Sequence, residues 1–131
     1  KRGINISYEN DGKNKYLIYG IENRIEQIIA NLLDNAISFS DDNKDVIVQV
    51  SKSEDNKVYI KILDEGQGFK EKDTNKIFKR FYSNRPDKFG QHSGLGLNIV
   101  KNLVDLHNAT IKATNRQDKK GASMEIEFPK V

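Results

Sequence analysis

The sequence contains no cysteine, two prolines and only two histidines. Without cysteine the chain forms no disulfide and no thiolate metal site, and it has no cysteine nucleophile. Two histidines are too few for a metal site built from a histidine cluster. No apolar run approaches the roughly 20 residues that span a bilayer, and no signal-peptide pattern opens the chain. These absences exclude disulfide scaffolds, zinc clusters and membrane-spanning segments for this stretch of sequence.

A strong charge of one sign is also missing. The chain has 22 basic and 19 acidic residues, with a net charge of +3. Its basic residues are scattered, whereas nucleic-acid binding requires a dense basic stripe, so we expect no nucleic-acid partner. The 131 residues, 36% hydrophobic and 31% charged, suit one globular domain over residues 1–131 with a real core. Because the chain begins at Lys1 without a methionine, we expect it to belong to a longer protein.

Hydrophobic periodicity predicts the order of the secondary structure. Apolar residues recur at helical spacing from Ile21 to Ile37 and again over residues 94–107. Alternating apolar residues predict strands over 46–50, 58–62, 109–115 and 122–128, and a hairpin of residues 4–8 with 16–19 about Asp11-Gly12. Two long helices and about six strands indicate an α+β fold, a two-layer α/β sandwich.

The first predicted helix carries two amides side by side on its polar face, Asn31 and Asn35. Asparagine is a mediocre helix former, because its amide competes for backbone hydrogen bonds. An amide oxygen is a hard, neutral ligand that suits Mg²⁺ alongside phosphate oxygens and water. The alternative is an ordinary solvated helix face.

The segment Asp64-Glu65-Gly66-Gln67-Gly68 directly follows a predicted buried strand. Its glycines permit positive φ and let a ligand approach the backbone closely. A carboxylate at the strand end is able to accept a hydrogen bond from an exocyclic amine such as that of adenine. A plain strand-to-loop turn is the alternative.

A glycine-rich stretch, residues 90–97, leads into the second predicted helix. Free N–H groups and the positive dipole end make a helix N-terminus an anion site, and Gly94 and Gly96 leave room for a phosphate chain. The stretch lacks the GxxxxGK[ST] pattern of the P-loop, and a predicted exposed loop precedes it instead of a strand, which excludes the dinucleotide fingerprint. A flexible glycine-rich cap is the alternative.

Taken together, the order and spacing of these segments resemble the catalytic and ATP-binding domain of bacterial two-component sensor histidine kinases. That domain belongs to the GHKL ATPase superfamily, shared with gyrase, heat-shock chaperone ATPases and MutL-type repair proteins. The resembling blocks are residues 31–36 for the N box, 64–68 for G1, 77–82 for the F box, 94–97 for G2 and 121–123 for a degenerate last glycine motif. Residues 81–86 with 90–94 resemble an alphaproteobacterial envelope-sensing branch.

The resemblance implies a mixed β-sheet packed on three helices, with a flexible ATP lid at about residues 83–96. It implies that Asn35 holds Mg²⁺ against the triphosphate of ATP, with Asn31 close to the same phosphates, and that Asp64 accepts from the adenine amine. The aromatic residues of the F box would support the lid. The further nucleotide contacts that it implies are Gly66, Gly68, Phe78, Phe81, Gly94, Leu95, Gly96 and Leu97.

One position separates the subfamilies. Members that hydrolyse ATP with water carry a glutamate where this chain has Asn31, and an amide takes no proton from water at neutral pH. The resemblance therefore implies a histidine kinase, with Asn31, Asn35 and Arg85 as its catalytic residues. Ser38 and Ser83 stand where kinases often carry cations, so a nucleotide-binding module with degraded catalysis remains an alternative. A water-using ATPase is another.

The implied partner is a histidine on a separate dimerisation domain of the same protein, with a response regulator as an indirect one. This domain alone would be monomeric and the full-length protein a homodimer, in the cytoplasmic part of an inner-membrane sensor. Neither histidine has the expected acceptor context. We expect His92 to lie in the lid facing solvent, and His107 to cap or pack a helix end.

Overall fold

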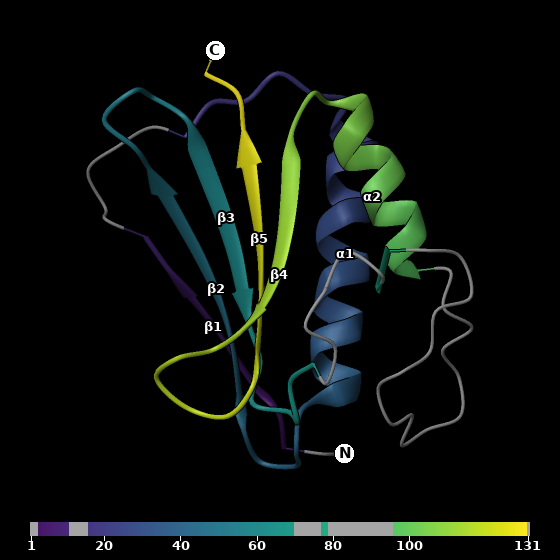
Figure 1. The fold of residues 1–131 in the computed structure, drawn as a ribbon, viewed down its shortest axis with the longest axis vertical. Coiled ribbons are helices and arrows are strands. Elements are labelled where there is room, and N and C mark those ends of the chain that lie inside the picture. Colours follow the sequence, from purple (N-terminus) through teal and green to yellow (C-terminus); the bar gives the residue numbers. More distant parts are fainter. Residues whose placement is uncertain (1–2, 11–15, 70–76, 79–95, 131) are drawn as a thin grey trace.

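The computed structural model describes residues 3–10, 16–69, 77–78 and 96–130 (Figure 1). Two helices and five strands follow one another in the order β1 (Asn5–Glu9), α1 (Glu22–Phe39), β2 (Asp45–Lys52), β3 (Val58–Leu63), α2 (Gly96–Leu106), β4 (Thr110–Asn115) and β5 (Ala122–Phe128). These bounds confirm the predicted helix from Ile21 and the four strands predicted after it.

The strands form one mixed sheet in the order β1-β2-β3-β5-β4. β1 pairs with β2 in parallel, and every other pairing is antiparallel. Parallel neighbours need a long crossover connection, and α1 supplies it here. The sheet therefore places the carboxyl end of β3 beside the start of β5.

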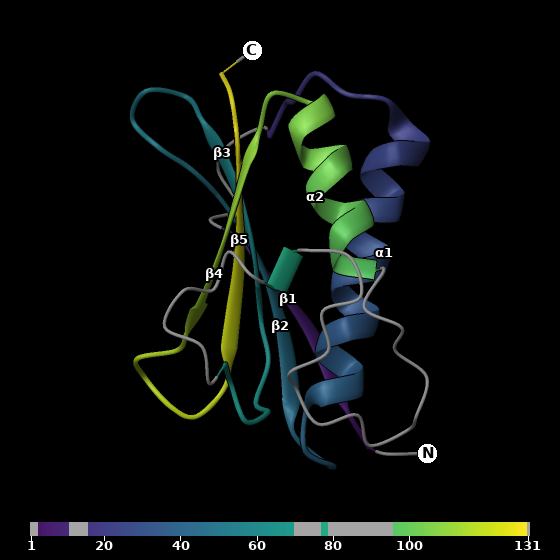
Figure 2. The ribbon, with the colours of Figure 1, turned by 45° about the vertical axis from the view of Figure 1, so that its right-hand side comes forward.

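Both helices cover the same face of the sheet, which gives two layers (Figures 1 and 2). Their apolar stripes pack against alternate residues of the central strands. The residues of this core that are fully buried include Ile28, Leu32, Val46, Val100, Val104, Ile126 and Phe128. The α+β sandwich expected from the sequence is confirmed.

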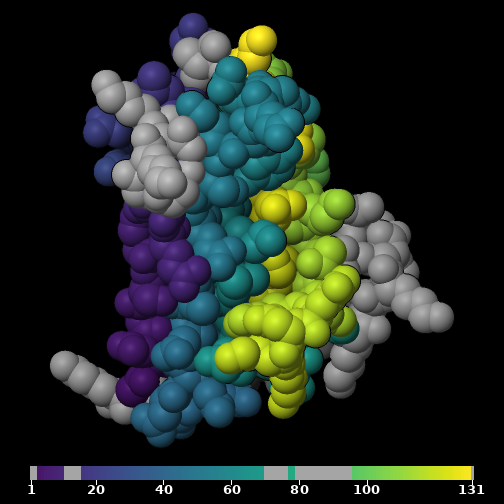
Figure 3. All heavy atoms as spheres, turned by 90° about the vertical axis from the view of Figure 1, so that its left-hand side faces the viewer, coloured from purple at the N-terminus to yellow at the C-terminus, as the bar shows by residue number. Residues whose placement is uncertain are grey.

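The other face of the sheet carries polar side chains and is seen in Figure 3, where the strands follow one another from purple β1 to yellow-green β4. Lys61 of β3 pairs with Glu125 of β5 at 3.8 Å, and Lys57, directly before β3, pairs with Glu127 at 3.6 Å. Exposed pairs of this kind contribute little to stability. They show which residues of each strand point away from the helices.

The predicted hairpin of residues 4–8 with 16–19 is wrong. β1 pairs in parallel with β2, and residues 16–20 form no strand. The sheet accordingly has five strands in the described part of the chain, not six. Alternation in Ile4, Ile6 and Tyr8 identified the strand correctly, but period alone does not fix a strand's partner.

The sequence also predicts a short helical turn around residues 77–81, and most of it lies outside the described residues. Ile77 and Phe78 form part of a 3₁₀ turn and are buried in the core. The second long helix is confirmed from Gly96 onward. Within the described ranges, neither helix combines the length and the apolar character that a membrane crossing requires.

Candidate functional site

Asp64 lies at the carboxyl end of β3, with only 3% of its surface exposed. Its backbone N–H donates to the carbonyl of Ala122, which extends the β3–β5 ladder by one residue (3.0 Å). Its carboxylate oxygen Oδ1 accepts from the backbone N–H of Gly66 at 2.9 Å and from that of Ala122 at 3.0 Å. Two backbone donors on one oxygen fix the direction in which the carboxylate points.

The end of α1 is joined to the same segment. Ser40, fully buried just after α1, bridges to Gly66, and its hydroxyl accepts from the N–H of Glu65 at 3.3 Å. The N–H of Asp41 donates to the carbonyl of Glu65 at 3.4 Å. Because Asn35 lies little more than one turn before Ser40, this junction brings the last turns of α1 to the residues that follow β3.

Two glycines let separate pieces of backbone meet here. Gly68 has φ +78°, and a Cβ on it would lie 2.5 Å from Oδ1 of Asn115. Gly121 has φ +144°, and a Cβ on it would lie 2.0 Å from the carbonyl oxygen of Asp64. Both positions need glycine because of their positive φ and because a Cβ would clash with the neighbouring chain segment. The sequence interpretation assigned Gly68 to close approach of a ligand, and the contact with Asn115 is a second reason for glycine there.

The connection between β4 and β5, residues 116–121, holds the segment 64–69 from the other side. The side-chain amide of Asn115 accepts from the N–H of Phe69 at 2.6 Å and donates to its carbonyl at 3.0 Å. Arg116 donates from a terminal guanidinium nitrogen to the carbonyl oxygen of Asp64 at 3.1 Å. Lys119 lies 3.4 Å from the carboxylate of Glu65. These contacts restrain a glycine-rich segment that would otherwise have several conformations.

Glu65 turns away from Asp64 and ties the segment to β2. Its carboxylate accepts from the N–H of Asp45 at 2.7 Å. That hydrogen bond, and after it the charge of Lys119, lowers the pKa of Glu65 below its ordinary value. Glu65 is therefore an ionised structural carboxylate at neutral pH, and of the two acidic residues Asp64 remains the candidate for a ligand contact.

The first turn of α2 is linked to the 3₁₀ turn at Ile77 and Phe78. Both are buried in the core, and the amide of Asn98 donates to the carbonyl of Phe78 at 3.1 Å. Leu97 packs against the same core. A Cβ on Gly96, at the start of α2, would meet nothing within 4 Å among the described atoms. Among the described residues, nothing therefore requires glycine at this position.

Asn31 and Asn35 lie half-buried in the second half of α1. Among the described residues, no group of three or more histidine, cysteine, aspartate or glutamate side chains could hold a metal ion. A neutral amide such as that of Asn35 suits Mg²⁺ only when other ligands, such as phosphate oxygens, complete its shell. The residues present thus fit Mg²⁺ that arrives with a polyphosphate.

The remaining predicted site residues lie outside the described part of the chain. They are Phe81, Arg85, Gly94 and Leu95, together with His92 and most of the predicted lid. The structure links the end of α1 to the segment after β3, and the 3₁₀ turn to the start of α2. These four segments carry the other predicted residues.

His107 has the packing role that its position predicted. It is buried at the end of α2, and its Nε2 accepts from the N–H of Ile21 at 3.1 Å. Its Nδ1 lies 2.7 Å from the carbonyl of Leu103. Because the backbone N–H of Ile21 can only donate, Nε2 is the acceptor and the ring proton is on Nδ1. Both ring nitrogens are therefore engaged in hydrogen bonds. His107 joins the two helices and is not placed to accept a phosphoryl group.

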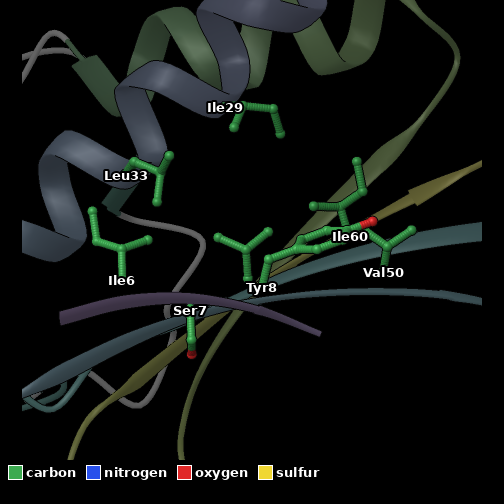
Figure 4. A pocket seen from close by; sticks show the side chains of 8 residues that line it. Ile6, Ser7, Tyr8, Ile29, Leu33, Val50 and Ile60 are labelled. Atoms are coloured by element: carbon green, nitrogen blue, oxygen red, sulfur yellow. The ribbon is translucent and has the colours of Figure 1, made fainter. Parts of the chain in front are cut away.

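An apolar hollow of about 360 Å³ lies between α1 and the β1 side of the sheet (Figure 4). Ile29 and Leu33 of α1 face Ile6, Tyr8 and Ile60 across it. None of its lining residues carries a charge, so it offers nothing to a phosphate or a metal ion. The strand-end cluster around Asp64 is therefore the better candidate site.

Four residues that shape the cluster were not identified from the sequence: Ser40, Asn98, Asn115 and Arg116. Each acts on a residue distant in sequence, and only the topology brings them together. Gly121 gave the one available signal, because a glycine opening a strand next to a polar turn indicates a close backbone approach.

Residues 20–131 match the family described as histidine kinase-, DNA gyrase B- and HSP90-like ATPases. The chain belongs to this ATPase family. A curated member, the sensor protein ChvG of Agrobacterium fabrum, is 36% identical over 128 residues, which cover 92% of this chain and 21% of ChvG. The chain thus spans about a fifth of that relative's length. ChvG comes from an alphaproteobacterium, which agrees with the alphaproteobacterial branch that this sequence resembles.

Solved members of the ATPase family share the fold. The catalytic domain of histidine kinase ThkA superposes with a TM-score of 0.82 and 27% identity, and the match covers 98% of this chain and 80% of that one. Full-length ShkA, solved in complex with AMPPNP, gives 0.80 and 26%, covering 98% of this chain and 26% of ShkA. The resemblance to sensor histidine kinase catalytic domains is therefore confirmed.

Proposed function

We propose that this domain binds Mg-ATP and transfers its γ-phosphoryl group to a histidine on a separate dimerisation domain. The buried Asp64 carboxylate carries the proposal: it is fixed at the end of β3 by two backbone N–H groups. A carboxylate in this position accepts a hydrogen bond from the exocyclic amine of adenine. Membership in the ATPase family and the AMPPNP complex of the similar kinase ShkA support ATP as the ligand.

Each part of the cluster has a role in this proposal. Asn35 completes the shell of Mg²⁺ on the triphosphate, and the metal neutralises phosphate charge when it is bound. Asn31 contacts the same phosphates, and the backbone at Gly96 and Leu97 receives them at the start of α2. Gly66 and Gly68 border the base. Arg85 belongs to the proposed lid over residues 83–96, and the F-box residues Phe78 and Phe81 support that lid.

A kinase is favoured over a water-using ATPase because of Asn31. An amide is no general base, so water bound here would not be activated. An imidazole nitrogen of the acceptor histidine is already a nucleophile; it attacks the γ-phosphorus as the bond to the ADP oxygen breaks. The domain then contributes position and charge stabilisation. In the parent protein we place it on the cytoplasmic side of the inner membrane, with a response regulator taking the phosphoryl group next.

A transfer assay tests the proposal. The chain is mixed with ATP labelled on the γ-phosphate, Mg²⁺ and a dimerisation domain that carries the acceptor histidine. We expect acid-labile label on the dimerisation domain and none on this chain. Release of labelled phosphate at the same rate without the acceptor would favour the ATPase. ATP binding without either product would favour the alternative of a binding module with degraded catalysis.

A further inference from the structure

Arg116 is a nearly buried cation, and it is not among the site residues predicted from the sequence. Only 4% of its side chain is exposed, although it lies in the turn between β4 and β5. Removing a guanidinium from water is costly unless its donors are satisfied. Here two of its nitrogens, Nε and a terminal nitrogen, donate to the carboxylate of Asp118 at 3.0 and 2.8 Å. The other terminal nitrogen donates to the main-chain carbonyl of Asp64 at 3.1 Å.

The electrostatics keep this arrangement charged. The hydrogen bonds from Arg116, and then its charge, lower the pKa of Asp118 to about 2. The same pairing with Asp118, followed by the charges of Glu65 and Asp64, raises the pKa of Arg116. The two hydrogen bonds to Asp118 therefore fix the plane of the guanidinium group, and its other terminal nitrogen is directed at the backbone carbonyl of Asp64.

We propose that Arg116 is a positioning residue for recognition of the nucleotide base, acting through the backbone of Asp64. The inference rests on the proposed function, in which Asp64 accepts from the adenine amine. Gly66 and Gly68 leave the segment after β3 flexible by composition, so its restraint has to come from outside it. Arg116 fixes the carbonyl of Asp64 while Ala122 fixes the carboxylate, and together they set where the carboxylate points.

Positioning predicts loss of base selectivity, whereas a merely structural role does not. The measurement is the ratio of the affinities for ATP and for inosine triphosphate, which lacks the exocyclic amine, by calorimetry with Mg²⁺. Arg116→Met keeps the apolar part of the side chain and removes the guanidinium group with its hydrogen bonds. We expect the ratio to fall roughly tenfold, as for a lost charged hydrogen bond, while the affinity for inosine triphosphate stays within about twofold of wild type.

Three further variants sharpen the test. Asp118→Ala removes an exposed carboxylate and leaves Arg116 in place without the two hydrogen bonds that orient it. It should lower the ratio several-fold, and it tests the positioning role if Arg116→Met does not fold. Gln117→Ala, exposed in the same turn, is the matched control and should leave the ratio unchanged. In an Asp64→Asn background, Arg116→Met should have no further effect on the ratio, because it acts through that carboxylate.

Equal losses for both nucleotides, with the ratio retained, would overturn the assignment and leave Arg116 a structural residue. A wild-type preference for ATP that Asp64→Asn abolishes but Arg116→Met and Asp118→Ala do not would also overturn it, with the proposed function intact. No preference for ATP in the wild type and no effect of Asp64→Asn would instead contradict the base assignment on which both rest.

Discussion

Gly121 brings the turn between β4 and β5 against the strand end that carries Asp64. A Cβ at this position would lie 2.0 Å from the Asp64 carbonyl oxygen, and φ is +144°. We expect Gly121→Ala to lower the free energy of unfolding by at least about 2 kcal/mol, because both the clash and the backbone conformation oppose it. Urea unfolding measures the change.

Gly96→Ala is the matched control for this substitution. A Cβ at Gly96 meets nothing within 4 Å of the described atoms, and alanine is the better helix former. Its free energy of unfolding should stay within about 1 kcal/mol of wild type, while ATP binding weakens if phosphates approach this backbone. Equal stability of both alanine variants would contradict the close approach at Gly121.

Glu65 makes a second prediction at the scale of the residue, through pH. Its pKa in the folded protein lies below the ordinary value of 4.5, chiefly because the N–H of Asp45 donates to it. Its contribution to stability is therefore complete above pH 4.5 and is lost as the pH falls through the lower folded pKa. Glu65→Gln should flatten the acid side of the stability profile and leave its slope above pH 6 unchanged. An equally steep acid loss in the variant would show that other carboxylates cause it.

At the scale of the element, α1 supplies both a structural face and a proposed chemical face. Asn35→Ala should strengthen the helix by about 0.5 kcal/mol, because alanine has the higher propensity. The same change should remove most of the Mg²⁺ dependence of ATP affinity. Calorimetry with and without Mg²⁺ gives this difference. Asn102→Ala, on the exposed side of α2, is the control that gains helix propensity without losing the metal effect; an identical response of both would remove Asn35 from the site.

Periodicity in the sequence predicted most elements but not all of their pairings. Ile28, Leu32 and Ala36 recur at helical spacing, so α1 was predicted nearly to the residue. β1 was placed in a hairpin because Asp11-Gly12 is a strong local turn signal. Its pairing with β2 depends instead on the helix between them, a non-local preference that a turn dipeptide does not report.

The candidate site was predictable to a similar extent. Asp64 and Asn35 stand out because their side chains are chemically unusual for a strand end and a helix face. Arg116 and Asn115 look like ordinary polar residues of a hairpin, and their role arises only when β5 pairs with β3 and brings the turn onto Asp64. Contacts of this kind depend on the order of strands in the sheet, which the local sequence pattern does not predict.

At the scale of the whole molecule, the described residues form one sheet and two helices, and the polar contacts around Asp64 gather at one edge of that sheet. The end of α1, the strand end of β3 and the turn between β4 and β5 meet there through hydrogen bonds between distant parts of the chain. Along β1 the described residues line an apolar hollow. His107, the one histidine in the described part of the chain, has both ring nitrogens occupied and is not placed to be the acceptor of the proposed reaction.

The most direct test of the account is the affinity of this chain for Mg-ATP before and after removal of one carboxylate. Calorimetry compares the wild type with Asp64→Ala, and with Asp55→Ala as a control at the opposite end of β3. Thermal unfolding confirms that each variant is folded, and Asp64→Asn keeps the side-chain shape. We predict measurable binding by the wild type and by Asp55→Ala, and a loss of roughly 1–3 kcal/mol on substitution of Asp64. Equal affinity in wild type and both Asp64 variants, or no binding at millimolar nucleotide, would contradict it.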